Sequence, residues 1–215
     1  MFEEILSKNA KESLAILSKD PLFKKAYLAG GTALALQLGH RESKDLDFFT
    51  RGRFDPNNLA KKLSAQLSNF KLEKIAWGTV MGYIGETKFT IFFYDYPLLF
   101  KTKKFLGINI ADFRDIAAMK IAAVSDRGTR RDFIDLYFLL KKKTITLMDC
   151  LILYDQKFKK LQQNKIHIIK SLTYFIDAED EKMPKMFQPV EWQDVKKFLE
   201  RETKNLGKVI IIKGK

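Results

Sequence analysis

The fold of this chain is decided by Ala29-Gly30-Gly31-Thr32-Ala33, which is followed at a short distance by Lys44-Asp45-Leu46-Asp47-Phe48-Phe49. In the first stretch, a glycine pair separates a strand candidate at 26–29 from a helix expected over 33–38. Thr32 is placed to cap that helix and Gly39 to end it. Glycines at such a junction let backbone N–H groups approach a phosphate closely, and the helix dipole attracts the anion. A glycine pair before a helix is also typical of a plain turn.

The second stretch carries two carboxylates on the strand expected at 45–50. Residues i and i+2 of a strand face the same side, so Asp45 and Asp47 converge while Leu46 points into the core. Two like charges at this spacing stay ionised together only where water or a cation compensates them. Mg²⁺ takes one or two carboxylates together with substrate phosphates. The pair therefore predicts a site for Mg²⁺, or Mn²⁺ in its place, with a solvated strand end as the alternative.

Composition limits the class of protein. The 215 residues are 46% hydrophobic and 13% aromatic, which suffices for one substantial core. The formal charge of +13 predicts attraction to polyanions such as nucleic acid or nucleotides. One cysteine, Cys150, excludes an internal disulfide. The acidic start lacks a signal-peptide pattern, and no run approaches the ~20 apolar residues of a membrane span. We expect a cytoplasmic protein without a membrane interaction.

The hydrophobic pattern divides the chain into a mixed α/β front half and a helical back half. Glycines at 78, 82 and 85 separate β-prone segments that predict an antiparallel meander. Helical patterns are expected at 112–124, 131–142, 146–161, 166–178 and 190–205. We expect two domains, 1–142 and 143–215. Three lysine runs are interpreted as solvated faces or, combined, as a basic groove for tRNA: 101–104, 141–143 and 157–160.

The order of these features resembles the signature of the DNA polymerase β-like nucleotidyltransferases: a strand, Gly-Gly-Thr, a short helix, and then a strand with Asp-x-Asp. Downstream, Asp115-Ile-Ala-Ala-Met-Lys120 and the segment from Arg127 to Leu140 are similar to the abortive-infection nucleotidyltransferase toxins of the AbiEii/AbiGii type. The segment 94–99 also resembles the end of that family's sheet. The resemblance covers about residues 25–142. It implies an α+β (α/β) fold, a mixed sheet flanked by helices, with a helical C-terminal part.

Two charged side chains fall on apolar helices. Lys120 lies among alanines, Met119 and Ile121, so it must extend to water or meet an anion. Asp135 has apolar helical neighbours and needs a cationic partner, for which Lys120, Arg130 and Arg131 are candidates. Asp115 has a complete non-catalytic explanation, because Asp112 can cap its helix and place Asp115 at the third position.

The resemblance implies a role for each of these positions. The glycine turn with Thr32 holds the triphosphate, and the Asp pair binds the metal. The resemblance assigns Lys120 to the nucleotide phosphates, and an essential acid of the motif corresponds to Asp135 first and Asp132 second. Arg127, Arg130 and Arg131 form a basic cluster that binds phosphates of the NTP or of an RNA acceptor, or else is a solvated helix start.

The implied activity is transfer of an NMP from an NTP to an acceptor hydroxyl, with RNA, particularly a tRNA end, as acceptor. Such proteins are the toxin halves of toxin–antitoxin or phage-defence pairs, so a cognate antitoxin is an expected partner. One position departs from the superfamily pattern. Thr90 or Ile91 stands where a later strand carries a third metal-binding carboxylate. We therefore expect a two-acid metal site, and a catalytically silent nucleotide- or RNA-binding module on the same fold is the alternative.

Overall fold

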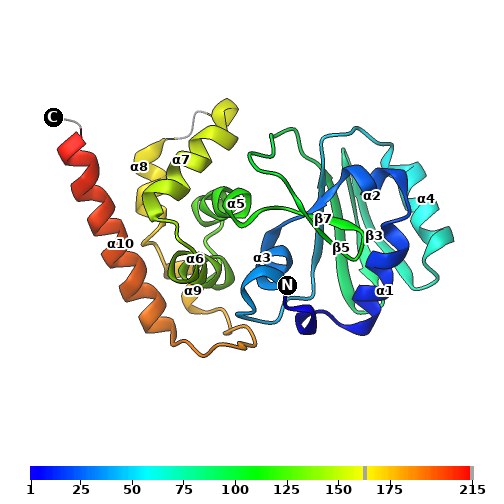
Figure 1. Cartoon of the computed structure of the whole chain (residues 1–215), viewed down its shortest axis with the longest axis horizontal. Coiled ribbons are helices and arrows are strands. Elements are labelled where there is room, and N and C mark those ends of the chain that lie inside the picture. Colours follow the sequence, from blue (N-terminus) through cyan, green and yellow to red (C-terminus); the bar gives the residue numbers. More distant parts are fainter. Residues whose placement is uncertain (162–163, 214–215) are drawn as a thin grey trace. The chain divides into compact units, whose positions relative to one another are not determined.

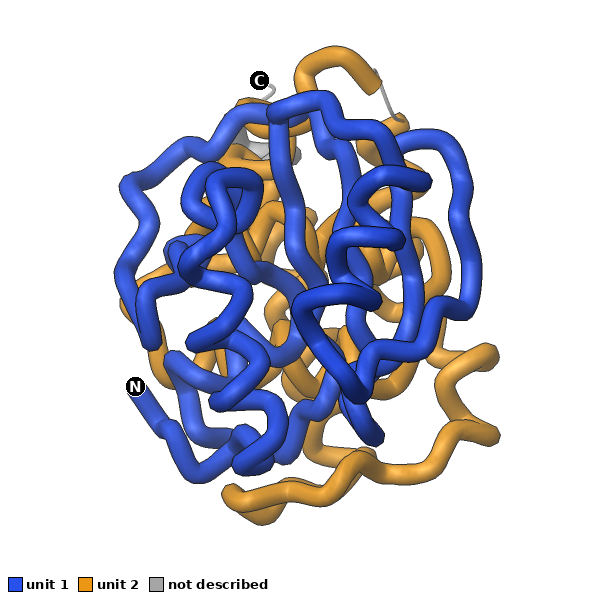
Figure 2. Tube along the Cα trace, turned by 90° about the vertical axis from the view of Figure 1, so that its right-hand side faces the viewer, with its two compact units in different colours: residues 1–112 blue, residues 113–215 orange. Residues whose placement is uncertain are grey.

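The computed structural model describes residues 1–161 and 164–213, with side chains through 208. The chain packs as two compact units, 1–112 and 113–215, coloured separately in Figure 2. The boundary between these units lies before the helix at 113, whereas the predicted domain boundary follows residue 142. Compact packing is a different property from independent folding, so the division at 142 stays a prediction about domains.

Unit 1 is built on a seven-stranded sheet with the order β3-β4-β5-β2-β1-β7-β6 (Figure 1). Strands β2 and β5 pair in parallel, as do β1 and β7, and the other neighbours are antiparallel. The mixed sheet and the predicted meander of β3, β4 and β5 are confirmed. The strands are β1 (Tyr27–Leu28), β2 (Leu46–Thr50), β3 (Phe70–Ala76), β4 (Thr79–Ile84), β5 (Thr87–Phe93), β6 (Lys103–Phe105) and β7 (Ile108–Ile110).

The β6–β7 hairpin was not predicted. Its strands have three residues each, too few to show a period of two. Leu106 and Gly107 both have positive φ, 47° and 79°, which is the geometry of a two-residue hairpin turn. A Leu-Gly pair is a weak indication of such a turn, because its first residue tolerates positive φ poorly.

One face of the sheet is covered by helices. Strand β2 alternates between buried and half-buried side chains, and β4 follows the same alternation. Phe48, Val80, Phe89 and Ile91 are fully buried, and Figure 1 shows α1, α2 and α4 on one side of the sheet. The helical elements of unit 1 are η1 (Glu3–Ile5), α1 (Lys8–Leu17), α2 (Pro21–Lys25), α3 (Gly30–Leu38) and α4 (Pro56–Gln66).

Unit 2 is helical, as predicted for the back half. One aromatic cluster joins three of its segments. The ring centroid of Phe175 lies 4.9 Å from that of Phe133 and 5.7 Å from that of Trp192. The expected helix over 166–178 is interrupted and forms α8 and α9. The elements are α5 (Phe113–Asp126), α6 (Arg130–Lys142), α7 (Leu147–Lys157), η2 (Lys159–Leu161), α8 (Lys165–Ser171), α9 (Ile176–Glu179) and α10 (Trp192–Lys213).

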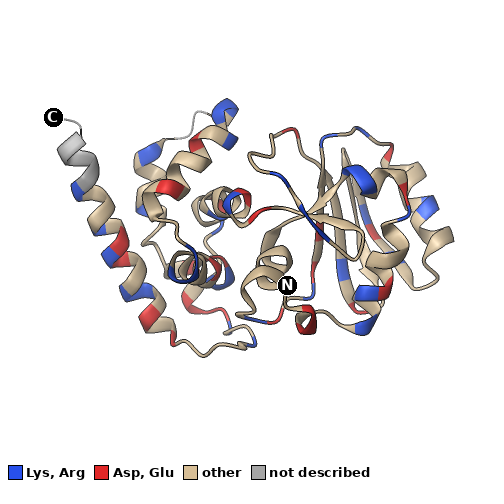
Figure 3. Cartoon of the chain, viewed as in Figure 1, with Lys and Arg blue, Asp and Glu red and all other residues tan. Residues whose placement is uncertain are grey.

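Basic and acidic residues are interspersed along the chain (Figure 3). Along α10, basic and acidic residues alternate, and basic residues also occur on strands of the unit 1 sheet (Figure 3). Within the described part of the chain, no helix combines the length and the apolar character that a bilayer span requires.

Candidate active site

The glycine turn and the acid pair meet at the start of α3. Strands β1 and β2 are antiparallel, with Leu28 opposite Phe48, so the end of β1 lies beside the start of β2. The Ala29 N–H donates to the carbonyl oxygen of Asp47 at 3.0 Å. Gly30 has φ of +70°, and a Cβ placed on it would lie only 3.2 Å from Oδ2 of Asp47. Only glycine fits this turn without strain, because it tolerates positive φ and has no side chain to crowd the Asp47 carboxylate.

The acid pair lies on the side of β2 that faces away from the core. Leu46 and Phe48 are fully buried, whereas Asp45 and Asp47 are half-buried. Asp45 directly precedes β2. Two half-buried carboxylates beside a helix N-terminus form a donor set of hard oxygens, which suits Mg²⁺ or Mn²⁺. The residues present therefore fit the metal that the sequence implies, and Gly30 keeps the space beside Asp47 open.

Thr32 has a different role from the predicted one. Helix α3 begins at Gly30 with Ala29 as its N-cap and without a side-chain cap, so the prediction that Thr32 caps the helix is wrong. Its hydroxyl donates to the carbonyl oxygen of Asp45 and shares a 2.7 Å hydrogen bond with Ser43. Thr32 thus fixes the segment before β2. The amides of Gly30, Gly31 and Thr32 lie in the first turn of α3, where N–H groups lack partners within the helix. At the other end, Gly39 ends α3 in the left-handed conformation, as predicted.

The strand register shows which residue of β5 lies beside Asp47. Asp47 is directly opposite Thr90 of β5, and paired residues of neighbouring strands share a face. Thr90, 2% exposed, is therefore the residue beside Asp47, at the position where the resemblance implies a third carboxylate. Among the described residues, no group of three or more His, Cys, Asp and Glu side chains is placed to hold a metal.

In unit 2, Lys120 is the centre of a buried ionic cluster. Its Nζ lies 2.8 Å from Oδ1 of Asp132 and 2.6 Å from Oδ2 of Asp135, and the lysine side chain is 6% exposed. The prediction that Asp135 needs a cation is confirmed, with Lys120 as a partner. Asp132 also accepts hydrogen bonds from Arg127 Nε at 2.9 Å and from the Thr129 hydroxyl at 2.6 Å. Burial alone would raise the pKa of Asp132, but Lys120 and Arg127 outweigh it and hold the pKa well below the usual range.

The arginines of the predicted basic cluster have different partners. Arg127 is bound to Asp132, whereas the exposed Arg131 lies in the first turn of α6. Arg130 turns toward α9 and α10: it donates to the carbonyl oxygens of Ala178 and Glu179, and its guanidinium lies 4.8 Å from the Trp192 ring centroid. Arg130 therefore stabilises the fold of unit 2, which the sequence could not show.

Comparison of the sequence with known proteins identifies its family. The family described as "Nucleotidyl transferase AbiEii toxin, Type IV TA system" matches residues 12–76 and 85–207. The chain belongs to this family. The uncharacterized protein aq_aa25 of Aquifex aeolicus (strain VF5) is 35% identical over 210 residues, 93% of this chain and 96% of that protein. The resemblance stated from sequence is confirmed, and the chain is a nucleotidyltransferase.

Two solved structures share the fold. JHP933 from Helicobacter pylori has a TM-score of 0.58 at 22% identity and covers 97% of this chain and 96% of its own. MenT4, a nucleotidyltransferase toxin from Mycobacterium tuberculosis H37Rv, has a TM-score of 0.60 at 14% identity and covers 90% of this chain and 81% of its own. At these identities the likeness concerns the architecture alone, and it confirms the predicted fold class.

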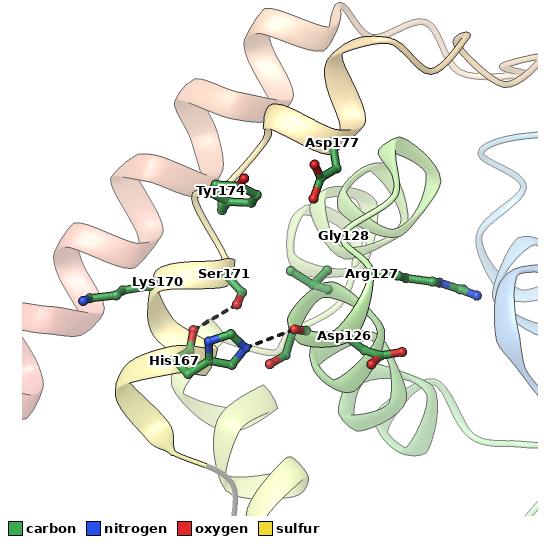
Figure 4. Close-up of a pocket in the computed structure, with 10 residues that line it drawn as sticks. Asp126, Arg127, Gly128, His167, Lys170, Ser171, Tyr174 and Asp177 are labelled. Carbon is green, nitrogen blue, oxygen red and sulfur yellow. Dashed lines mark hydrogen bonds between the residues drawn. The ribbon is translucent and has the colours of Figure 1, made fainter.

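A cavity of about 320 Å³ in unit 2 lies among α5, α8 and α9 (Figure 4). His167 Nε2 lies 3.3 Å from the carbonyl oxygen of Ser125, and the Ser171 hydroxyl donates to the carbonyl oxygen of His167 at 2.9 Å. Arg127 and Lys170 contribute to the lining, but their charged ends point away from the cavity in Figure 4. The cavity is therefore a poor candidate for binding phosphate.

One buried ion pair of unit 2 was missed. Lys157 and Asp115 are fully buried, and Lys157 Nζ lies 2.8 Å from Oδ1 of Asp115. The interpretation of the run 157–160 as a solvated face is wrong at its first residue, and the capping explanation of Asp115 is incomplete. Burial lowers the pKa of Lys157, while Asp115 opposes the shift. The charged neighbours of Lys157 in the sequence gave no indication of this burial.

Proposed function

We propose that this chain transfers an NMP from an NTP to the hydroxyl of an RNA acceptor, in a reaction that depends on Mg²⁺ or Mn²⁺. The observation that carries this proposal is the approach of the Asp47 carboxylate to Gly30 at the N-terminus of α3. A phosphate at that helix end would meet backbone N–H groups and the positive end of the dipole. The same position lies beside two carboxylates that suit a divalent cation.

Each residue of unit 1 has a defined task in this proposal. The amides of Gly31 and Thr32 bind the β- and γ-phosphates, and the Thr32 hydroxyl keeps the segment before β2 in place. Asp45 and Asp47 would hold the metal, which would supply charge neutralisation during transfer. The acceptor hydroxyl attacks the α-phosphorus in line, the new P–O bond forms, and the bond to pyrophosphate breaks.

The resemblance also assigns roles to Lys120 and Asp135. On the resemblance, Lys120 is proposed to act on the triphosphate. Its charge is offset by contacts with Asp132 at 2.8 Å and Asp135 at 2.6 Å, and the second contact supports a role for Asp135 in orienting the lysine. Loss of the acceptor proton to Asp135 is the other hypothesis. Arg127 and Arg131 are proposed to add positive charge for the phosphates of the nucleotide. For Arg127 this charge is partly offset by its hydrogen bonds to Asp132.

RNA is the proposed acceptor because the chain carries an excess of thirteen positive charges. A tRNA end is the form of acceptor that the resemblance implies. The type IV toxin–antitoxin description of the family supports a toxin role with an antitoxin partner. Expression of the chain alone should then arrest growth, and coexpression of the antitoxin should relieve the arrest.

The deciding experiment incubates the protein with Mg²⁺, total RNA and each of the four NTPs labelled at the α-phosphate. Label should move to RNase-sensitive material, and label at the γ-phosphate should stay unincorporated. Asp47→Asn should abolish transfer. Asp95→Asn is the matched control, because Asp95 is an exposed acid just beyond β5 and should retain activity.

Three results would separate this proposal from its alternatives. RNA binding without transfer from any NTP would support the silent binding module. Transfer to protease-sensitive material would exclude RNA as acceptor. Transfer that survives in Asp47→Asn would refute the assignment of the acid pair.

A further inference from the structure

The face of the sheet that carries Asp47 continues across three more strands. Asp47 of β2 lies opposite Thr90 of β5, Thr90 opposite Met81 of β4, and Met81 opposite Lys74 of β3. Directly paired residues share a face of the sheet, so these four side chains form one row. A row of mixed polar character thus runs from the acid pair to the edge strand β3.

A second row lies next to the first. Lys88 of β5 is directly opposite Tyr83 of β4, and Tyr83 is directly opposite Lys71 of β3. Tyr83 is 37% exposed, Lys71 is exposed and Lys88 is half-buried. Lys88 and Tyr83 stand two residues from Thr90 and Met81 on their strands, so both rows occupy the same face. We name Lys71, Tyr83 and Lys88 together the Lys-Tyr-Lys row.

Sheet stability alone does not account for this arrangement. Lysines on edge strands protect against unwanted pairing, which explains Lys71 and Lys74 on β3. Lys88 lies on β5, which has neighbours on both sides, so edge protection does not explain it. A cross-strand carboxylate stabilises a lysine in a sheet, and the β2–β5 register continues to Asp45 beside Lys88. Tyr83, however, has a lysine on each side, which cross-strand pairing of charges does not explain.

We propose that the Lys-Tyr-Lys row binds the single-stranded end of the RNA acceptor and leads it to the acid pair. This inference rests on the proposed function and names the surface that its acceptor uses. Proteins bind single strands by combining lysines along the backbone with aromatic rings on which bases stack. From ordinary strand spacing, Tyr83 stands about 12 Å from Asp47, two strands and one row away. A base on Tyr83 therefore leaves only a short length of strand to reach the acids.

The test measures binding of a fluorescent single-stranded RNA by anisotropy, and Mn²⁺ binding by electron paramagnetic resonance. Tyr83→Ala should weaken RNA binding about 5- to 160-fold, as expected for loss of one stacked base. Tyr83→Phe should bind like the wild type, because the ring is retained. The double variant Lys71→Gln, Lys88→Gln should reduce the magnitude of the slope of log K against log salt by about 1.4, because each phosphate contact on a single strand contributes about 0.7. Lys61→Gln on α4 is the matched control, because Lys61 is exposed on a helix at the covered face.

Mn²⁺ binding that is not weakened in these variants shows that the fold and the acid pair are intact. The inference is overturned if Tyr83→Ala and the double lysine variant bind RNA within twofold of the wild type, or if the wild type binds no RNA. Failure of the proposed function looks different: α-label then reaches no RNA, or reaches it in Asp47→Asn as well. A wild type that transfers label to RNA while Tyr83→Ala keeps full affinity rejects this surface alone.

Discussion

Gly30→Ala tests the contact on which the site depends. At φ of +70° an alanine costs about 1–2 kcal/mol relative to glycine, and the stiffer unfolded chain returns about 0.4–1 kcal/mol. We expect a net loss of about 1 kcal/mol in the free energy of unfolding. The new Cβ would also lie 3.2 Å from Oδ2 of Asp47, so the carboxylate must move by a few tenths of an ångström.

That displacement should matter more for chemistry than for stability. A misplacement of about 1 Å costs about 100-fold in rate, so a shift of this smaller size should lower NMP transfer about tenfold. Mn²⁺ affinity should fall in parallel, because Asp47 is a proposed ligand. Both quantities can be measured on the same preparation, together with unfolding in urea.

Gly85→Ala separates backbone strain from the contact with Asp47. Gly85 has φ of +60°, but its Cβ would meet only Asn9 and Asn69 at an ordinary 3.5 Å. This variant should lose the same stability, about 1 kcal/mol, and keep transfer and Mn²⁺ affinity within twofold. Equal losses of activity in both variants, or full activity in Gly30→Ala, would refute the reasoning.

Three further predictions concern unit 2. Asp115→Asn or Lys157→Met alone should cost about 3–5 kcal/mol in urea unfolding, because each leaves a buried charge unpaired, while a double apolar replacement should recover most of the loss. The pKa of Asp132 is lower in the folded than in the unfolded protein. The stability that its ionised form contributes is therefore fully present above the ordinary carboxyl pKa of about 4 and is lost as the pH falls through the folded pKa. Asp132→Asn should flatten the acid limb of a stability–pH profile. Burial raises the pKa of Cys150 to about 12, so Ellman's reagent should label it only after unfolding, and rapid labelling of the native protein would contradict its burial.

Much of unit 1 could be predicted because its decisive residues lie close together in sequence. The alternation of Leu46, Asp47 and Phe48 defines which side of β2 is buried, and the structure has that pattern. The short connection from β1 through α3 to β2 returns Asp47 to the glycine turn. Thr32 was misassigned because a hydroxyl at a helix start usually caps that helix, whereas here it bonds to the segment before β2.

Partners in unit 2 could be predicted less well. The helical pattern shows that Lys120 and Asp135 lie among apolar neighbours, but periodicity does not show which helix faces which. Lys120 pairs with an acid twelve residues away as well as with Asp135, and Lys157 pairs with Asp115 over 42 residues. Such distant pairings depend on how α5, α6 and α7 pack against one another, and no local rule contains that information.

Net charge is a poor measure of how strongly this chain should respond to salt. Lys157 is 1% exposed and Arg130 is bound to α9, so neither can neutralise a phosphate of bound RNA. If the three lysines on the sheet face that carries Asp47 (71, 74 and 88) neutralise one phosphate each, log K against log salt should have a slope of about −2. If all thirteen excess charges acted on the RNA, the slope would be about −9. A titration from low to moderate salt distinguishes these values, and the steeper one would show that RNA is held by the general basic surface rather than by this face.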